Sequence, residues 1–219
     1  MDGPGLRERK KLRTRHTLVE TAVRLFERKG FEETTVAEIA AAAEVSTRTF
    51  FSYFASKEDV IFFDIRARTD RALAVIADRA PGEPVVDLLR RVAEAIFRGP
   101  RGADDEEANH SLEDARLAMR LAAARHQLIM SVPALQARAL HLLFDVQIEL
   151  VEAVERAYAG ELDQVEAAAA VGAFVGAAKV AAMACQKRGE PPEAMWAAAL
   201  RGVEIAALGL GSLGGPGRA

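Results

Sequence analysis

The sequence contains a single cysteine, Cys185, and this scarcity excludes two common sources of stability and chemistry. One cysteine forms no disulfide within the chain and supports no cysteine-rich zinc cluster. The four histidines, His16, His110, His126 and His141, are scattered without a metal-ligand spacing. We therefore expect neither a metal site nor a cofactor.

Aromatic residues make up only 6% of the chain, and the common catalytic motifs are missing as well. The sequence has no glycine-rich phosphate loop and no nucleophile elbow. His141 and Asp145 lie four residues apart on one predicted helix, but no nucleophile accompanies them, because Cys185 lies in an alanine-rich stretch. We expect no catalytic residues.

Long apolar runs are also scarce. The N-terminus is polar and lacks the apolar core of a signal peptide. The stretch from Ala167 to Cys185 is the best candidate for a membrane span, but it is mostly alanine and glycine and carries Lys179. It contains no leucine or isoleucine, so its burial in a membrane would give too little energy for insertion. We expect a buried helix there and a cytoplasmic protein.

Alanine dominates the hydrophobic half of the composition, and this favours an all-α fold. The net charge of −3 is unevenly distributed. Six basic residues and one acid lie between Arg7 and Arg15, whereas residues 104–107 are all acidic. A basic arm on an acidic protein is typical of a local nucleic-acid contact, although a solvated helix start gives the same pattern.

Helix-breaking residues divide the chain into about nine predicted helices, with no convincing strand. The expected helices cover about residues 6–29, 36–43, 47–54, 56–79, 85–98, 112–130, 134–158, 161–188 and 192–208. Gly30 lies where a helix C-cap glycine belongs. Residues 99–109 are expected to form a mobile loop, and residues 209–219 a disordered tail.

The first three predicted helices have the geometry of a helix-turn-helix head, because the last two are short and joined by a tight turn. The third helix and its flanks lack acidic residues between Val45 and Ser56. Its polar and aromatic side chains suit phosphates, base edges and thymine methyl groups; they are Ser46, Thr47, Arg48, Thr49, Phe51, Ser52 and Tyr53. Lys57 adds a cation at the start of the next helix, beside backbone N–H groups that suit a phosphate.

This region resembles the DNA-binding head of the TetR family of bacterial transcriptional regulators. The first half of the resemblance is the run AVRLFERKGFEETTVAEIA at residues 22–40. The second half is AEVS at 43–46, TFFSYF at 49–54 and SKED at 56–59. The resemblance covers about residues 12–63. It implies an all-α homodimer that binds a palindromic double-stranded DNA operator and that a small molecule releases, most often a repressor.

The resemblance also implies a role for each matching position. Thr35 contacts a phosphate; Thr47, Arg48 and Phe51 face the major groove; Thr49, Tyr53 and Lys57 clamp the DNA backbone; Arg13 and Arg15 approach phosphate or the minor groove. The family usually has glycine where this chain has Glu44. Because that turn position favours a left-handed backbone, we expect Glu44 to cost about 1 kcal/mol or to shift the turn.

By the same resemblance, residues 1–56 form the arm and DNA-binding domain, and residues 57–208 form a ligand-binding and dimerisation domain with a connector helix from Lys57. The last two helices carry stripes of small residues that imply a four-helix dimer interface: Val165, Ala169, Gly172, Gly176 and Met183 on one, and Ala199, Gly202 and Ala206 on the other. A glycine inside a helix costs about 1 kcal/mol relative to alanine, so it marks close backbone approach. Packing within one subunit is the alternative explanation.

The middle helices are expected to enclose an effector. The candidate pocket residues are Phe97, Arg116, Met119, His126, Met130, His141, Phe144, Asp145 and Phe174, although a place in the core or on the surface is the more common fate of such residues. The head also resembles a subgroup related to the mycofactocin regulators, some of which respond to acyl-CoA. This resemblance favours a hydrophobic effector.

Three alternative functions stay open on the sequence alone. A ligand-independent DNA-binding regulator would bind DNA and no small molecule would release it. An activator differs from a repressor only in the position of its operator. An enzyme is the least favoured alternative, and it would show turnover that is lost on changing His141, without specific DNA binding.

Overall fold

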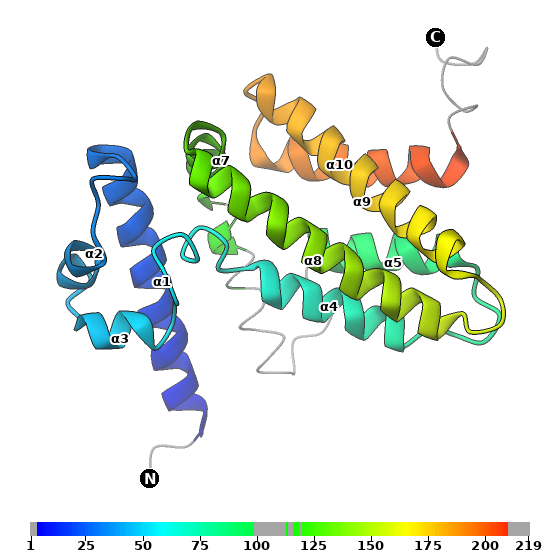
Figure 1. The fold of residues 1–219 in the computed structure, drawn as a ribbon, viewed down its shortest axis with the longest axis horizontal. Helices are drawn as coiled ribbons and strands as arrows, with labels where there is room; N and C mark the ends of the chain where they lie inside the picture. Colours follow the sequence, from blue (N-terminus) through cyan, green and yellow to red (C-terminus); the bar gives the residue numbers. More distant parts are fainter. Residues whose placement is uncertain (1–3, 99–112, 114–115, 119, 210–219) are drawn as a thin grey trace. The chain divides into compact units, whose positions relative to one another are not determined.

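A computed structural model of the chain describes residues 4–98, 113, 116–118 and 120–209. All regular elements in these residues are helices, and the prediction of an all-α fold is confirmed (Figure 1). The predicted mobile loop at 99–109 and all but the first residue of the predicted tail at 209–219 lie outside the described residues.

The described helices follow the predicted order. They are α1 (Pro4–Lys29), α2 (Val36–Ala42), α3 (Thr47–Phe51), α4 (Ile65–Ala77), α5 (Val85–Arg98), α7 (Ala122–Ser131), α8 (Pro133–Ala157), α9 (Gln164–Lys187) and α10 (Pro192–Leu208). Most boundaries lie within a few residues of the predicted ones. The predicted helix over 112–130 is described over its second half by α7.

The connector helix is shorter than predicted, because α4 begins at Ile65 rather than near Ser56. Ser56 does cap the segment, since its Oγ accepts from Asp59 N at 3.3 Å. The residues that follow form turns, with Ile61 N donating to Glu58 O at 3.0 Å. Residues 60–63 are four consecutive apolar side chains, and all four are buried. An α-helix would expose part of this run, which explains why tight turns replace it.

Side-chain caps set the starts of three helices. Thr35 caps α2 and Asp163 caps α9, each in a reciprocal capping box with the glutamate three residues on. Ser46 caps α3 by accepting from Thr49 N at 3.0 Å. These caps satisfy backbone N–H groups that a helix start leaves without partners. The cap at Asp163 places the start of α9 later than the predicted residue 161.

The described residues form two compact units. The first contains residues up to Arg66 and those from 113 to Leu142, and the second contains Ala67–Arg98 and Leu143–Gly209. Helices α4 and α8 each begin in the first unit and end in the second. This partition reflects packing, and the functional boundary at residue 56 stays a prediction.

The first unit has a core in which α1, α2 and α3 pack with α7 and the start of α8. Leu18 of α1, Ile39 of α2 and Phe50 of α3 are fully buried, as are Leu117 and Leu135 from later in the chain. Burial of each such side chain contributes about 1.5–3 kcal/mol. The head is therefore stabilised in part by residues that follow it by more than sixty positions.

The second unit has its own core, built from α5, the end of α8, α9 and α10. Leu88, Val154, Val171 and Val203 lie in this cluster, and each is at most 5% exposed. Helices α9 and α10 approach closely at Gly202, where an added Cβ would lie 2.5 Å from Ala177 O. Glycine is therefore required at this crossing.

Helix α9 is the described helix that is long and apolar enough to cross a membrane by length and composition. Only 22% of its most apolar window is buried within the chain, so the prediction of a buried helix holds for one face only. The buried face contains Val171, Phe174 and Ala178. The other face, which includes Val165 and Val180, is exposed.

Candidate nucleic-acid interface

Helices α2 and α3 form the predicted helix-turn-helix, and their inner faces fix its geometry. Ile39 of α2 and Phe50 of α3 are 0% exposed, and the Phe50 and Phe54 rings lie 5.7 Å apart. The turn between the helices passes through Glu44, whose φ of 56° is left-handed. The expected left-handed turn is therefore present, and a glutamate occupies it.

The outer face of α3 carries the side chains predicted to meet DNA. Thr47, Arg48 and Phe51 are exposed, and Phe51 is 56% exposed in spite of its apolar ring. Phe51 is held in place by Phe50, because the two rings pack edge to face at 5.5 Å.

The hydroxyl groups around α3 serve the helix itself. Ser46 Oγ caps Thr49 N and lies 2.9 Å from Thr49 Oγ1, and Ser52 Oγ donates to Thr49 O at 2.6 Å. Thr35 likewise accepts from Glu38 N at 3.2 Å. These four predicted DNA-contacting residues therefore have structural roles, and any DNA contact they make is additional.

Lys57 is placed differently from the prediction. Its Nζ donates to the carbonyl oxygens of Phe31 at 2.8 Å, Thr34 at 3.2 Å and Glu32 at 3.3 Å. The same Nζ lies 4.4 Å from the centre of the Phe31 ring. The three carbonyl oxygens accept hydrogen bonds from the ammonium group, and the ring face attracts its positive charge. Lys57 therefore ties the connector to the loop before α2, and its predicted contact with the DNA backbone stays a prediction.

The two arm arginines also differ from each other. Arg13 is exposed. Arg15 points inward: it donates to Phe63 O and its guanidinium lies 5.5 Å from the centre of the Phe63 ring. The prediction of a DNA contact therefore suits Arg13, and Arg15 braces the head. Other exposed basic residues on this part of α1 are Arg7, Arg9, Lys10 and Lys11.

Tyr53 follows α3, is half-buried and packs against the core of the first unit. Its hydroxyl forms no hydrogen bond with other described residues. Phenolic oxygens both donate and accept, so this group suits a phosphate oxygen. A backbone clamp at Tyr53 stays a prediction.

An arginine from α7 secures the connector, which the sequence did not indicate. Arg125 donates to Ile61 O and Asp64 Oδ1, each at 2.7 Å, and its guanidinium lies 5.0 Å from the centre of the Phe63 ring. Arg125 is 13% and Asp64 only 4% exposed at the side chain, so this is a buried ion pair. Arg138 adds a pair with Asp59 at 3.0 Å. We call Arg125, Asp64 and Phe63 the connector latch.

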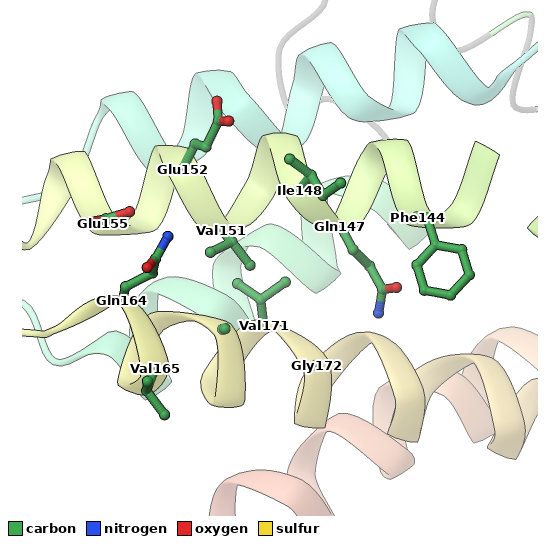
Figure 2. Close-up of a pocket in the computed structure, with 11 residues that line it drawn as sticks. Phe144, Gln147, Ile148, Val151, Glu152, Glu155, Gln164, Val165, Val171 and Gly172 are labelled. Carbon is green, nitrogen blue, oxygen red and sulfur yellow. The ribbon is translucent and has the colours of Figure 1, made fainter. Parts of the chain in front are cut away.

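The second unit contains an open groove of about 600 Å³ between α8 and α9. Figure 2 shows Val151 of α8 and Val171 of α9 facing one another across it, with Phe144 and Gln147 further along α8. The complete lining is Phe144, Gln147, Ile148, Val151, Glu152, Glu155, Gln164, Val165, Ala168, Val171 and Gly172. The groove has an apolar floor and two acidic side chains on α8.

The predicted pocket residues are divided between the two units, and a shared site for them stays a prediction. Phe144 lines the groove, whereas Phe174 is buried in the core of the second unit. His126 is half-buried in the first unit, and this burial lowers the pKa of its imidazole. The exposed predicted residues are Arg116, Met130, His141 and Asp145, and the side chains of Phe97 and Met119 lie outside the description. Single-residue polarity could not reveal which face each helix turns inward.

The predicted dimer residues fall into two groups. On α9, Val165, Ala169, Gly172 and Met183 are exposed and Gly176 is half-exposed, with no described atom within 4 Å of an added Cβ at either glycine. On α10, Ala199 and Gly202 are buried against α9 of the same chain, so intrachain packing explains them. Ala206 is partly buried in the same cluster. Val180, 65% exposed, extends the α9 stripe and was missed by the sequence pattern.

No group of three or more histidine, cysteine, aspartate or glutamate side chains suited to a metal occurs within the described ranges. Cys185 is buried, and Arg188 donates to its Sγ at 3.1 Å. The pKa of this thiol is raised, because of its contact with Glu190 and its burial.

Comparison with known proteins finds matches for the helix-turn-helix head. Residues 18–62 match the family model described as bacterial regulatory proteins, tetR family. The chain is 40% identical over 116 residues to the HTH-type transcriptional regulator TcmR of Streptomyces glaucescens, a match that covers 53% of this chain and 51% of TcmR. It is 36% identical over 52 residues to HbdR of Aromatoleum sp. strain CIB, covering 24% and 23% of the two chains. The chain thus spans about half, or less, of the curated relatives it matches.

Solved structures resemble the whole fold. A TetR-family regulator from Syntrophomonas wolfei gives a TM-score of 0.56 at 16% identity, covering 92% of this chain and 98% of the other. The fatty acid degradation regulator FadR of Bacillus halodurans gives 0.54 at 18% identity, covering 96% and 98%. At these identities the likeness shows the fold alone. All these matched proteins are named as regulators, in agreement with a regulator rather than an enzyme.

Proposed function

We propose that the chain is a sequence-specific DNA-binding transcriptional regulator of the TetR family of bacterial regulatory proteins, and that it represses its targets from the cytoplasm. The observation that carries this proposal is the outer face of α3, where Thr47, Arg48 and Phe51 are exposed on a helix seated by Phe50. A short helix of this kind enters the major groove in helix-turn-helix proteins. The exposed basic residues of α1 add favourable contacts with phosphates.

We propose further that two chains bind one palindromic operator. A dimer places two heads on a two-fold axis, with half-sites one helical turn or a multiple of it apart, about 34–36 Å per turn. The exposed small-residue stripe on α9 supports this assembly, because Gly172 and Gly176 leave room for a second backbone. Val165, Val180 and Met183 supply exposed apolar area on the same helix.

A small hydrophobic effector is proposed to control DNA binding. The groove between α8 and α9 supports this, since valine and isoleucine side chains and Phe144 line it. A ligand that binds more tightly to a conformation with misplaced heads lowers DNA affinity by the ratio of its two affinities. The resemblance to the mycofactocin-related subgroup, and hence an acyl effector, stays a prediction.

The test is a mobility shift of the full chain with the DNA that flanks its own gene, at fixed salt and with excess nonspecific competitor. The proposal predicts a complex that depends on an intact palindrome, and Tyr53→Ala and Thr47→Ala each weaken it. Arg201→Ala, at an exposed position of α10 that does not line the groove, serves as the matched control and leaves DNA binding unchanged. The function is rejected if neither this DNA nor genome-wide selection yields a sequence-specific complex.

A further inference from the structure

Helix α3 is short enough for its outward side chains to be considered one at a time. It spans five residues, Thr47–Phe51, and Phe50 faces the head core. The hydroxyls of Thr49 and Ser52 are engaged with the helix and its cap. The two large side chains on the outer face are Arg48 and Phe51.

Arg48 offers a fork of hydrogen-bond donors that nothing in the described chain uses. It is exposed, and no acidic residue occurs between Val45 and Ser56 to pair with it. A guanidinium has five N–H donors and no acceptor. In the major groove, guanine presents two acceptors side by side, N7 and O6, and this is the edge that matches the fork.

Phe51 offers the opposite chemistry. Its ring is 56% exposed, forms no hydrogen bonds and is oriented by edge-to-face contact with Phe50 at 5.5 Å. The apolar group on the major-groove edges of the four standard base pairs is the C5-methyl of thymine. Contact with that methyl removes apolar area of both partners from water.

The spacing of the two side chains fits neighbouring bases. Arg48 and Phe51 lie three residues apart in α3. This spacing separates them by about 4.5 Å along the helix axis and places both on the same face of the helix. Successive base pairs are about 3.4 Å apart. We propose that Arg48 reads a guanine, and Phe51 the methyl of a thymine, within two base pairs of each other in every operator half-site. This inference rests on the proposed function and specifies its target.

The experiment begins with selection of binding sites from a random double-stranded DNA library by the full chain. A consensus with guanine and thymine within two base pairs in each half is expected. Two modified duplexes then probe the edges: 7-deazaguanine removes N7 from the guanine, and deoxyuridine removes the methyl from the thymine. Each changes one group and keeps the base pair.

The expected result is a selective loss of sensitivity. Wild type binds the 7-deazaguanine duplex about fivefold or more weakly, whereas Arg48→Ala shows no preference between the two duplexes. Deoxyuridine weakens wild type about fourfold, the effect of one methyl group, and leaves Phe51→Ala unaffected. Both positions are exposed, so the variants should keep the helix content of wild type, which circular dichroism checks.

Arg13→Ala is the matched control for a phosphate contact. It should weaken every duplex alike and reduce the slope of log affinity against log salt by about one. If Arg48→Ala shows that same uniform pattern, or if Phe51→Ala stays sensitive to deoxyuridine, the readout proposed here is wrong. A selection that yields no consensus contradicts the proposed function instead, so the two failures are distinguishable.

Discussion

At the turn between α2 and α3, the backbone of Glu44 has a φ of 56°, the one positive value among the non-glycine residues described. A side chain in this conformation costs about 1–2 kcal/mol. Glu44→Gly should therefore raise the free energy of unfolding by about 1 kcal/mol, after the entropy that glycine adds to the unfolded chain. Denaturant unfolding measures the change.

Glu33→Gly is the control for that substitution, because Glu33 is exposed and has a negative φ. It should lower stability slightly, since glycine only adds unfolded-state entropy there. Equal effects of the two substitutions would show that the left-handed turn at Glu44 carries no strain.

Glu38 makes the head sensitive to acid. Its carboxylate accepts from Lys29, and it caps Thr35 N at 2.9 Å, which lowers its pKa from 4.5 to about 2. A lowered folded-state pKa adds stability above pH 4.5, and this stability is lost as the pH falls from 4.5 toward 2. The melting temperature of wild type should therefore fall through this range more steeply than that of Glu38→Gln. Parallel curves would contradict the assignment.

Among the elements, α7 should contribute to the stability of the connector through its arginine. Arg125→Ala leaves the buried Asp64 carboxylate without this partner, and loss of one member of a buried pair costs about 3–5 kcal/mol. Arg120→Ala removes an ion pair with Glu20 whose side chains are 61% and 51% exposed, so it should cost under about 1 kcal/mol. Equal losses of unfolding free energy in the two variants would contradict a structural role for the connector latch.

The crossing of α9 and α10 depends on a missing side chain. In Gly202→Ala, the added methyl would lie 2.5 Å from Ala177 O and 3.0 Å from Ala181 Cβ. Such overpacking destabilises by about 1–3 kcal/mol, measured by thermal or denaturant unfolding. Gly172→Ala meets no described atom within 4 Å, so the fold of the single chain should tolerate it. A neutral Gly202→Ala would show that the helices separate easily.

Periodicity and breakers located most helices, and the start and end of α5 agree with the prediction. The start of α4 was missed because Ser56 and Asp59 resemble a capping box, and they do form a cap, but the buried run at 60–63 then favours turns. Tertiary packing decides whether such a segment forms a helix or turns, and the local sequence pattern carries no information about that packing.

In the candidate site, too, features set by local sequence could be predicted and contacts between distant residues could not. The α3 face followed from local chemistry, because the inward positions of Phe50 and Phe54 determine which residues point out. The contacts of Lys57 with three carbonyls, and of Arg125 with Asp64, join residues far apart in the sequence. No spacing rule predicts such contacts. The groove itself could not be predicted, since it depends on which faces of α8 and α9 meet, and the pocket residues stay a prediction.

For the whole molecule, dimerisation should depend on the exposed stripe of α9. Val165 is 76% exposed and Gly172 has free space around it, so Val165→Glu and Gly172→Leu should leave the fold of one chain intact. A buried unpaired charge or an oversized side chain at the interface weakens association. Sedimentation equilibrium should show dimers for wild type and monomers for both variants. Unchanged dimers would place the interface elsewhere.

The most direct test of the account is a titration of the purified chain against its selected palindromic duplex and a scrambled duplex of the same composition, at one salt concentration. A specific regulator should bind the palindrome at least about 10³-fold more tightly, with two chains per duplex. Equal affinity for both duplexes, with binding that only follows salt, would mean that the chain contacts phosphates without reading sequence.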